Sequence, residues 1–179
     1  FHWQPLWLRL DLEERQRFCR HIRHIWGVHR HRVPPQADRK LREWTANGQF
    51  VLHAGRITDF VPGADGVTIR YRSREGYIQQ PFQVQRVYNC TGPLSNPKKM
   101  SMSLVQNLLR RGDVTPDPLQ IGFQCGPHGR LTQDNGTSHP FLWGIGPIVK
   151  GVYWEIVAMP DIRLMAQNMA NHIVASLKE

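Results

Sequence analysis

The sequence lacks the short motifs that identify most nucleotide-binding and hydrolytic enzymes. It contains no G-x-G-x-x-G dinucleotide fingerprint, no P-loop, no G-x-S-x-G nucleophile elbow and no H-E-x-x-H metalloprotease helix. It also has no apolar run long enough to span a membrane, no secretory signal peptide, no internal repeat and no low-complexity segment. We therefore name no catalytic residue from motifs, and we expect a cytoplasmic protein without a membrane partner.

Cysteine is scarce, with three residues in 179. Cys19, Cys90 and Cys125 are widely spaced and odd in number, which is neither a disulfide framework nor a zinc pattern. This usage fits a reducing cytosol. Cys90 follows an expected strand and is a candidate reactive thiol, but no base stands beside it in the sequence. We interpret Cys90 as a small buried residue.

Acidic residues are too few to balance the basic ones. The chain has 23 Lys and Arg against 14 Asp and Glu, which gives a net charge of +9, and the excess is concentrated between Arg9 and Arg42. A basic balance favours nucleic acid or an anionic cofactor as a partner. Because no nucleic-acid motif accompanies the charge, we interpret it as a solvated helix face, or as a face that another part of a longer protein covers.

Histidines gather in the same region, at positions 21, 24, 29 and 31. His21 and His24 are spaced to lie about one helical turn apart, but no cysteine or carboxylate completes a zinc-ligand pattern. We predict no metal site. The segment His29–Arg32 remains a candidate for contact with a phosphate or a carboxylate.

Capping residues and apolar spacing predict several helices. Asp11 in the N-cap position and Glu14 three residues later predict a helix that ends at Gly27. The other expected helices span residues 36–46, Ser101 or Ser103 to Arg111, and Glu155 or Pro160 to Leu177. The last helix carries an apolar stripe with Met165 and Met169, which we interpret as core. The aromatic residues 1–11 are expected to pack against another part of the protein.

Short apolar and β-branched runs predict strands in the middle of the chain. The runs span residues 50–54, 56–61, 67–72, 82–88, 119–123 and 141–143. The pair Asp65-Gly66 is a hairpin signal, and residues 67–72 alternate apolar and polar as a half-exposed strand does. The first four runs therefore predict an antiparallel β-meander.

Two strands are followed by glycine and proline. The first corner is Tyr88-Asn89-Cys90-Thr91-Gly92-Pro93, and the second corner is Gly144-Ile145-Gly146-Pro147. Glycine at such a position permits close approach of the backbone to another group. The segment 144–151 precedes the last helix and is a candidate phosphate site. We interpret Glu155, which follows it, as a cap of that helix.

These elements predict an α+β fold with an antiparallel β-meander and packed helices. We expect a helical segment at residues 1–48, the β-meander and its strand end at 49–93, and a final segment at 94–179. The final segment contains a helix, a hairpin, a strand and the C-terminal helix.

The order of the motifs resembles the C-terminal part of bacterial FAD/NAD(P)-binding proteins. These flavoproteins are similar in fold to flavin-dependent monooxygenases and to disulfide reductases with two dinucleotide-binding domains. The resemblance covers residues 12–177, and its most specific parts are the two corners and His29–Arg32. It implies that this chain completes an FAD-type domain whose N-terminal Rossmann half, with the glycine-rich fingerprint, is absent.

The resemblance also implies roles for the corners. In these flavoproteins the first corner lies near the cofactors, and the second contacts the flavin ribityl and pyrophosphate groups. The cofactor-binding residues implied are Thr91, Gly92, Pro93, Gly144, Ile145, Gly146 and Pro147, and Pro147 stands where the family often has aspartate.

The resemblance further implies that the full-length parent is an oxidoreductase that uses FAD and NAD(P). The N-terminal half of the same protein would then be the partner of this chain. We expect the isolated chain to bind FAD weakly or not at all, to be inactive, and to self-associate. The alternative is a basic nucleic-acid-binding or protein-interaction module without catalysis.

Overall fold

The computed structural model describes residues 3–178 and divides into two compact units. Unit 1 contains the chain up to Gly27 and from Pro93 onward, and unit 2 contains Val28–Gly92. Each unit combines helices with a small antiparallel sheet, which confirms the α+β class. The segment boundaries expected after residues 48 and 93 stay a prediction. They were drawn from local sequence patterns, whereas the two units are defined by contacts between residues.

Three helices begin the described chain. They are α1 (Trp3–Arg9), α2 (Leu12–Arg17) and α3 (Arg23–Arg30), and a π-helical turn (Phe18–Ile22) joins α2 to α3. The capping box is confirmed. The Asp11 carboxylate accepts the Glu14 N–H at 2.8 Å, and the Glu14 carboxylate accepts the Asp11 N–H at 2.9 Å.

The predicted helix end at Gly27 is wrong, because α3 continues through this glycine to Arg30. A glycine ends a helix when it adopts the left-handed conformation. Gly27 does not have a positive φ, so nothing in its backbone interrupts the helix. The helix predicted at residues 36–46 corresponds to α4 (Pro35–Ala46). It starts within one residue of the predicted position and has proline in its first turn.

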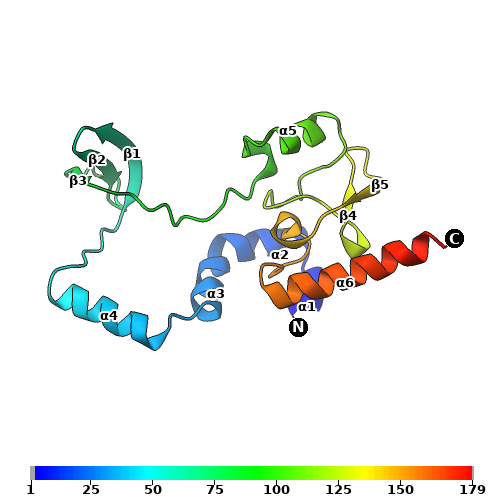
Figure 1. Ribbon diagram of the computed structural model, residues 1–179, viewed down its shortest axis with the longest axis horizontal. Coiled ribbons are helices and arrows are strands. Elements are labelled where there is room, and N and C mark those ends of the chain that lie inside the picture. The colour runs from blue at the N-terminus through cyan, green and yellow to red at the C-terminus, as the bar shows by residue number, and fades with distance from the viewer. Residues whose placement is uncertain (1–2, 179) are drawn as a thin grey trace. The chain divides into compact units, whose positions relative to one another are not determined.

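Unit 2 contains a three-stranded antiparallel sheet (Figure 1). Its strands are β1 (Arg56–Gly63), β2 (Gly66–Arg72) and β3 (Phe82–Val84), in the order β1-β2-β3. The predicted hairpin between β1 and β2 is confirmed, with Ala64 and Asp65 as its turn residues and Gly66 as the first residue of β2. A Cβ at Gly66 would lie 2.3 Å from the Val84 carbonyl oxygen. Only glycine therefore fits at this position.

Two strand predictions in unit 2 are wrong. Residues 50–54 form no strand, because the sheet consists of β1, β2 and β3 and gives this run no partner. The last strand ends at Val84 and not at Tyr88. Val84 pairs with Val67, and only Gly66 precedes Val67 in β2, so β2 has one residue at most to extend the pairing.

Unit 2 buries little apolar surface. Ile69 is 4% exposed, and it is the one buried hydrophobic residue among the described residues 28–92. Large apolar side chains of this unit are exposed; they include Val28, Val33, Leu41, Trp44, Val51, Leu52, Ile57, Phe60, Tyr77 and Ile78. The predicted alternation appears only in the second half of β2, where Ile69 is buried and Arg70 exposed, while β1 is exposed along nearly its whole length.

Unit 1 holds the main hydrophobic core. Its elements after residue 93 are α5 (Ser103–Arg110), β4 (Arg130–Thr132), β5 (Ser138–Trp143), a 3₁₀ turn (Gly146–Val149) and α6 (Met159–Ser176). Side chains from these elements and the loops between them form the core: Val105, Val114, Phe123, Cys125, Leu131, Val149, Ile156 and Met165. Met165 of α6 belongs to this core and Met169 packs against it, which confirms their predicted role.

The predicted strand at residues 119–123 is wrong. An isolated bridge between Pro116 and Phe123 replaces it, and Gln120 has φ +56°, a left-handed conformation that a strand does not accommodate. A turn around Asp117 therefore occupies this position.

Candidate functional site

The first corner is an exposed segment of irregular backbone. It does not follow a strand directly, because β3 ends at Val84. The Asn89 side-chain oxygen accepts the Thr91 N–H at 3.1 Å and the Thr91 hydroxyl at 2.7 Å, which forms a local turn. Gly92 has φ +84° and open space around it. The interpretation of Cys90 as buried is wrong, since this segment packs in no strand and Cys90 is exposed.

The second corner is a tight connection between β5 and the 3₁₀ turn. A Cβ at Gly144 would lie 2.7 Å from Val149 Cγ1 and 2.8 Å from Leu131 Cδ2. Gly144 is therefore required by the packing of the protein's own core. Gly146 differs, because it has φ +75° and its nearest neighbour is the Ile162 side chain at 3.6 Å.

Gly146 lies beside the first turn of α6, to which Ile162 belongs. Ile145 and Pro147, on either side of it, are exposed. A group that approached the second corner would meet these two side chains and the backbone of Gly146. The phosphate role of residues 144–151 stays a prediction, and the carboxylate of Asp161 in the first turn of α6 opposes an anion at that helix end.

The structure brings Gly144, Ile145, Gly146 and Pro147 together with the start of α6. Thr91, Gly92 and Pro93 are neighbours in the first corner, at the boundary between the two units. A single site formed by both corners stays a prediction.

Glu155 does not cap α6, whose N-cap residue is Ala158. Its carboxylate instead accepts the indole N–H of Trp26 at 3.0 Å. Glu155 is buried and has φ +65°, which is rare for a residue other than glycine. This buried carboxylate therefore holds α3 against the segment that follows the second corner.

A cation lies in the same segment. Lys150 places its ammonium group 4.9 Å from the ring centre of Trp154. Burial lowers the pKa of Lys150, the positive charge of Arg23 lowers it further, and the Glu155 carboxylate raises it. Perturbed titratable groups concentrate at functional sites, so this segment is a candidate for contact with an anion.

Sequence reasoning missed a buried carboxylate in unit 1. Asp117 is 1% exposed, and its two oxygens accept the N–H groups of Leu119 at 2.8 Å and Ile121 at 2.9 Å. It adjoins a cleft of about 410 Å³ between the α1–α2 connection and residues 151–152. The sequence Pro116-Asp117-Pro118 is the signal that was available, since aspartate beside proline favours such a turn.

Burial raises the pKa of Asp117 above its ordinary value, and the backbone hydrogen bonds oppose this shift. The folded protein then holds the proton more tightly than the unfolded chain. We expect the free energy of unfolding to fall as pH rises from about 4, the ordinary carboxyl pKa, through the raised pKa. Urea denaturation across this range should show the fall in the wild type and not in Asp117→Asn. A difference between the two proteins that stays constant with pH would contradict it.

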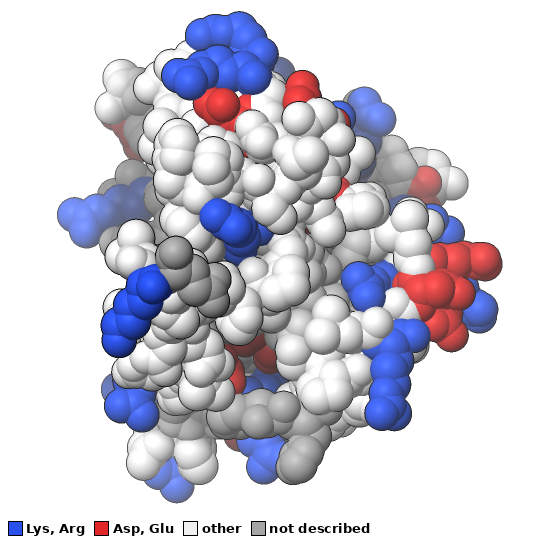
Figure 2. All heavy atoms as spheres, turned by 90° about the vertical axis from the view of Figure 1, so that its right-hand side faces the viewer, with Lys and Arg blue, Asp and Glu red and all other residues white. Residues whose placement is uncertain are grey.

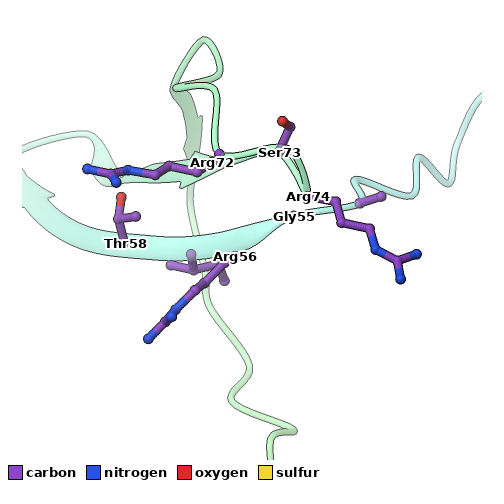
Figure 3. A pocket seen from close by; sticks show the side chains of 9 residues that line it. Gly55, Arg56, Thr58, Arg72, Ser73 and Arg74 are labelled. Carbon is purple, nitrogen blue, oxygen red and sulfur yellow. The ribbon is translucent and has the colours of Figure 1, made fainter.

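A second pocket lies in unit 2 at the open end of the β1–β2 hairpin (Figure 3). Its volume is about 790 Å³. Three arginines, Arg56, Arg72 and Arg74, line it together with Ala54, Gly55, Ile57, Thr58, Ser73 and Gly76. We call it the arginine pocket.

Across residues 3–178, no three His, Cys, Asp or Glu side chains lie together where they could hold a metal ion. Over the same residues, no helix combines the length and the apolar character needed to cross a membrane.

Comparison with known proteins finds distant relatives. The chain is 24% identical over 184 residues to uncharacterized protein Rv3403c of Mycobacterium tuberculosis (strain H37Rv) and to uncharacterized protein Mb3437c of Mycobacterium bovis. Each alignment covers 95% of this chain and 32% of the relative, so the chain spans about a third of the length of these proteins. No protein-family model and no solved structure matches it.

Proposed function

We propose that this chain is part of a longer FAD- and NAD(P)-dependent oxidoreductase, to which it contributes the second corner. The observation that carries the proposal is the geometry of Gly146. It has a left-handed backbone, adjoins the first turn of α6, and is flanked by exposed Ile145 and Pro147. A glycine of this kind at a strand end lets the backbone approach a bound nucleotide.

The residues at this corner fit a nucleotide in part. Gly146 is buried, with the Ile162 side chain at contact distance from a Cβ placed there, so only its backbone is offered, and the cationic Lys150 directly follows the same turn. Gly144 packs against the core of the chain, and its cofactor contact stays a prediction. When bound, the flavin would supply the redox chemistry, and the chain would orient it and exclude water.

The partner that we propose is the N-terminal part of the same protein. Two observations support it. The relatives are about three times as long as this chain, and unit 2 exposes apolar side chains that its own sheet and helices leave uncovered. Coverage of these side chains by the preceding domain would remove apolar surface from water.

Purified full-length protein is expected to be yellow and to absorb in the flavin bands. Gly146→Ala should lower its affinity for FAD about tenfold, because a side chain at this positive-φ position would shift the backbone that we propose approaches the cofactor. Gly136→Ala is the matched control, since Gly136 likewise has a positive φ but lies in the β4–β5 turn. A colourless full-length protein, or an equal loss in both variants, would overturn the proposal.

The second candidate is a binding module without catalysis. Unit 2 carries ten basic and five acidic side chains, and this net charge of +5 favours a polyanionic partner. Figure 2 shows a face of the molecule on which Lys and Arg are spread with uncharged surface between them, so this face presents no continuous basic patch. A colourless protein that bound DNA with a steep dependence on salt would favour this candidate.

A further inference from the structure

The arginine pocket gathers positive charge without a compensating carboxylate. Arg56 and Arg72 are register partners in the antiparallel pair of β1 and β2, and Arg74 follows two residues later. Like charges at directly opposed positions destabilise a sheet. Arg70, which shares a face with Arg72, pairs with Asp59 at 3.9 Å, but within residues 3–178 no ion pair joins the three pocket arginines to a carboxylate.

A β-bulge adds a hydroxyl group to this charge. The register of β1 and β2 shifts between Ile57 and Asp59, so Thr58 has no cross-strand partner. Bulges often redirect a side chain at a functional position. Figure 3 shows Thr58 pointing to the side of β1 along which the Arg72 side chain extends. A hydroxyl donor beside a guanidinium group is a combination that binds phosphate oxygens.

The shape of the pocket restricts the ligand. Figure 3 shows Arg56 and Arg74 extending away from Arg72 in two other directions, so the three guanidinium groups do not converge on one point. One phosphate group would meet Arg72 and Thr58, which share one side of β1, whereas Arg56 extends from its other side. The lining residues include no acid, and the neighbouring Glu75 is exposed outside them.

We propose that Thr58 and Arg72 bind a phosphate group of a small phosphorylated molecule such as a pyrophosphate compound. The pocket, at about 790 Å³, is of the size that accommodates a nucleotide-sized ligand. Arginine pairs with phosphate in a bidentate geometry, and an anion bound to Arg72 would offset the positive charge of the neighbouring arginines. This proposal does not rest on flavin binding, whose residues lie in the corners.

Pyrophosphate is the probe, and hydrogen exchange of the full-length protein is the readout. Pyrophosphate is expected to protect the backbone of residues 54–58 and 72–76 in the wild type. Arg72→Gln should abolish this protection and lower the affinity about tenfold. The same substitution should leave the stability of the free protein unchanged or higher, because it removes a like-charge pair. An arginine with a purely structural role would lower stability instead.

Arg86→Gln is the matched control, since Arg86 is an exposed arginine of unit 2 outside the pocket. Its affinity for pyrophosphate should equal that of the wild type. The proposal is overturned if pyrophosphate protects neither segment, or if Arg86→Gln loses as much affinity as Arg72→Gln. Protection by a single-stranded oligonucleotide and not by pyrophosphate would also overturn it, and would indicate contact with a nucleic-acid backbone.

Discussion

Gly151→Ala is expected to lower the free energy of unfolding by about 3–5 kcal/mol. A Cβ at Gly151 would lie 2.1 Å from the carboxyl carbon of Asp117, far inside contact distance. The carboxylate cannot move away without losing contacts, because it is buried and accepts the N–H groups of Leu119 and Ile121. The new methyl group must therefore break these hydrogen bonds or displace the turn.

Urea denaturation of the two proteins measures this effect. Gly126→Ala is the matched control, because a Cβ at Gly126 would lie 3.8 Å from the Ser138 hydroxyl and the backbone there is extended. We expect the control to change stability by less than about 0.5 kcal/mol. A loss of similar size in both variants would show that the close packing of Gly151 on Asp117 does not limit stability.

The parts of the fold that could be predicted from the sequence depend on neighbours in the chain. The capping box joins Asp11 to a residue three positions later, and the turn at Ala64-Asp65 joins two strands that are adjacent in the chain. The apolar stripe of α6 can be predicted from the helical period alone. Such signals are local, so a single sequence contains them in full.

The parts that were wrong depend on distant residues. β3 ends at Val84 because only Gly66 of β2 lies beyond the pair with Val67, and residues 50–54 lack a partner in the sheet. The environment of Asp117 likewise requires Gly151, 34 positions later, whose Cα lies against it. A local sequence pattern does not indicate which distant segment will pair with a strand or pack against a buried side chain.

The two glycines of the second corner show that a local pattern does not define a candidate site either. The sequence predicts close backbone approach at both Gly144 and Gly146, but their surroundings in the structure differ. A Cβ at Gly144 would clash with Leu131 and Val149 of the same chain, whereas a Cβ at Gly146 would meet Ile162 only at ordinary contact distance. A glycine pattern indicates that some group comes close, and only the packing decides between the core and a ligand.

Trp7→Ala is expected to lower the free energy of unfolding by about 3–5 kcal/mol. Trp7 is 3% exposed, and its ring stacks on Trp154 with 4.8 Å between the ring centres. Its indole N–H donates to the Gly151 carbonyl oxygen at 3.1 Å, a contact across 144 positions of the chain. Removal of the ring leaves a cavity, exposes Trp154 and deprives a buried carbonyl of its donor.

Two further variants separate these causes in the same denaturation assay. Trp7→Phe keeps an apolar ring and loses the N–H donor, so we expect a smaller loss of about 1–2 kcal/mol. Trp3→Ala removes an indole from the same helix that is 42% exposed and contacts Trp26 edge to face, and its loss should be about 1 kcal/mol. If Trp3→Ala were as damaging as Trp7→Ala, loss of α1 helix formation would explain both results. If Trp3→Ala lowers stability much less than Trp7→Ala, the stacking of Trp7 on Trp154 anchors α1 to the segment after the second corner.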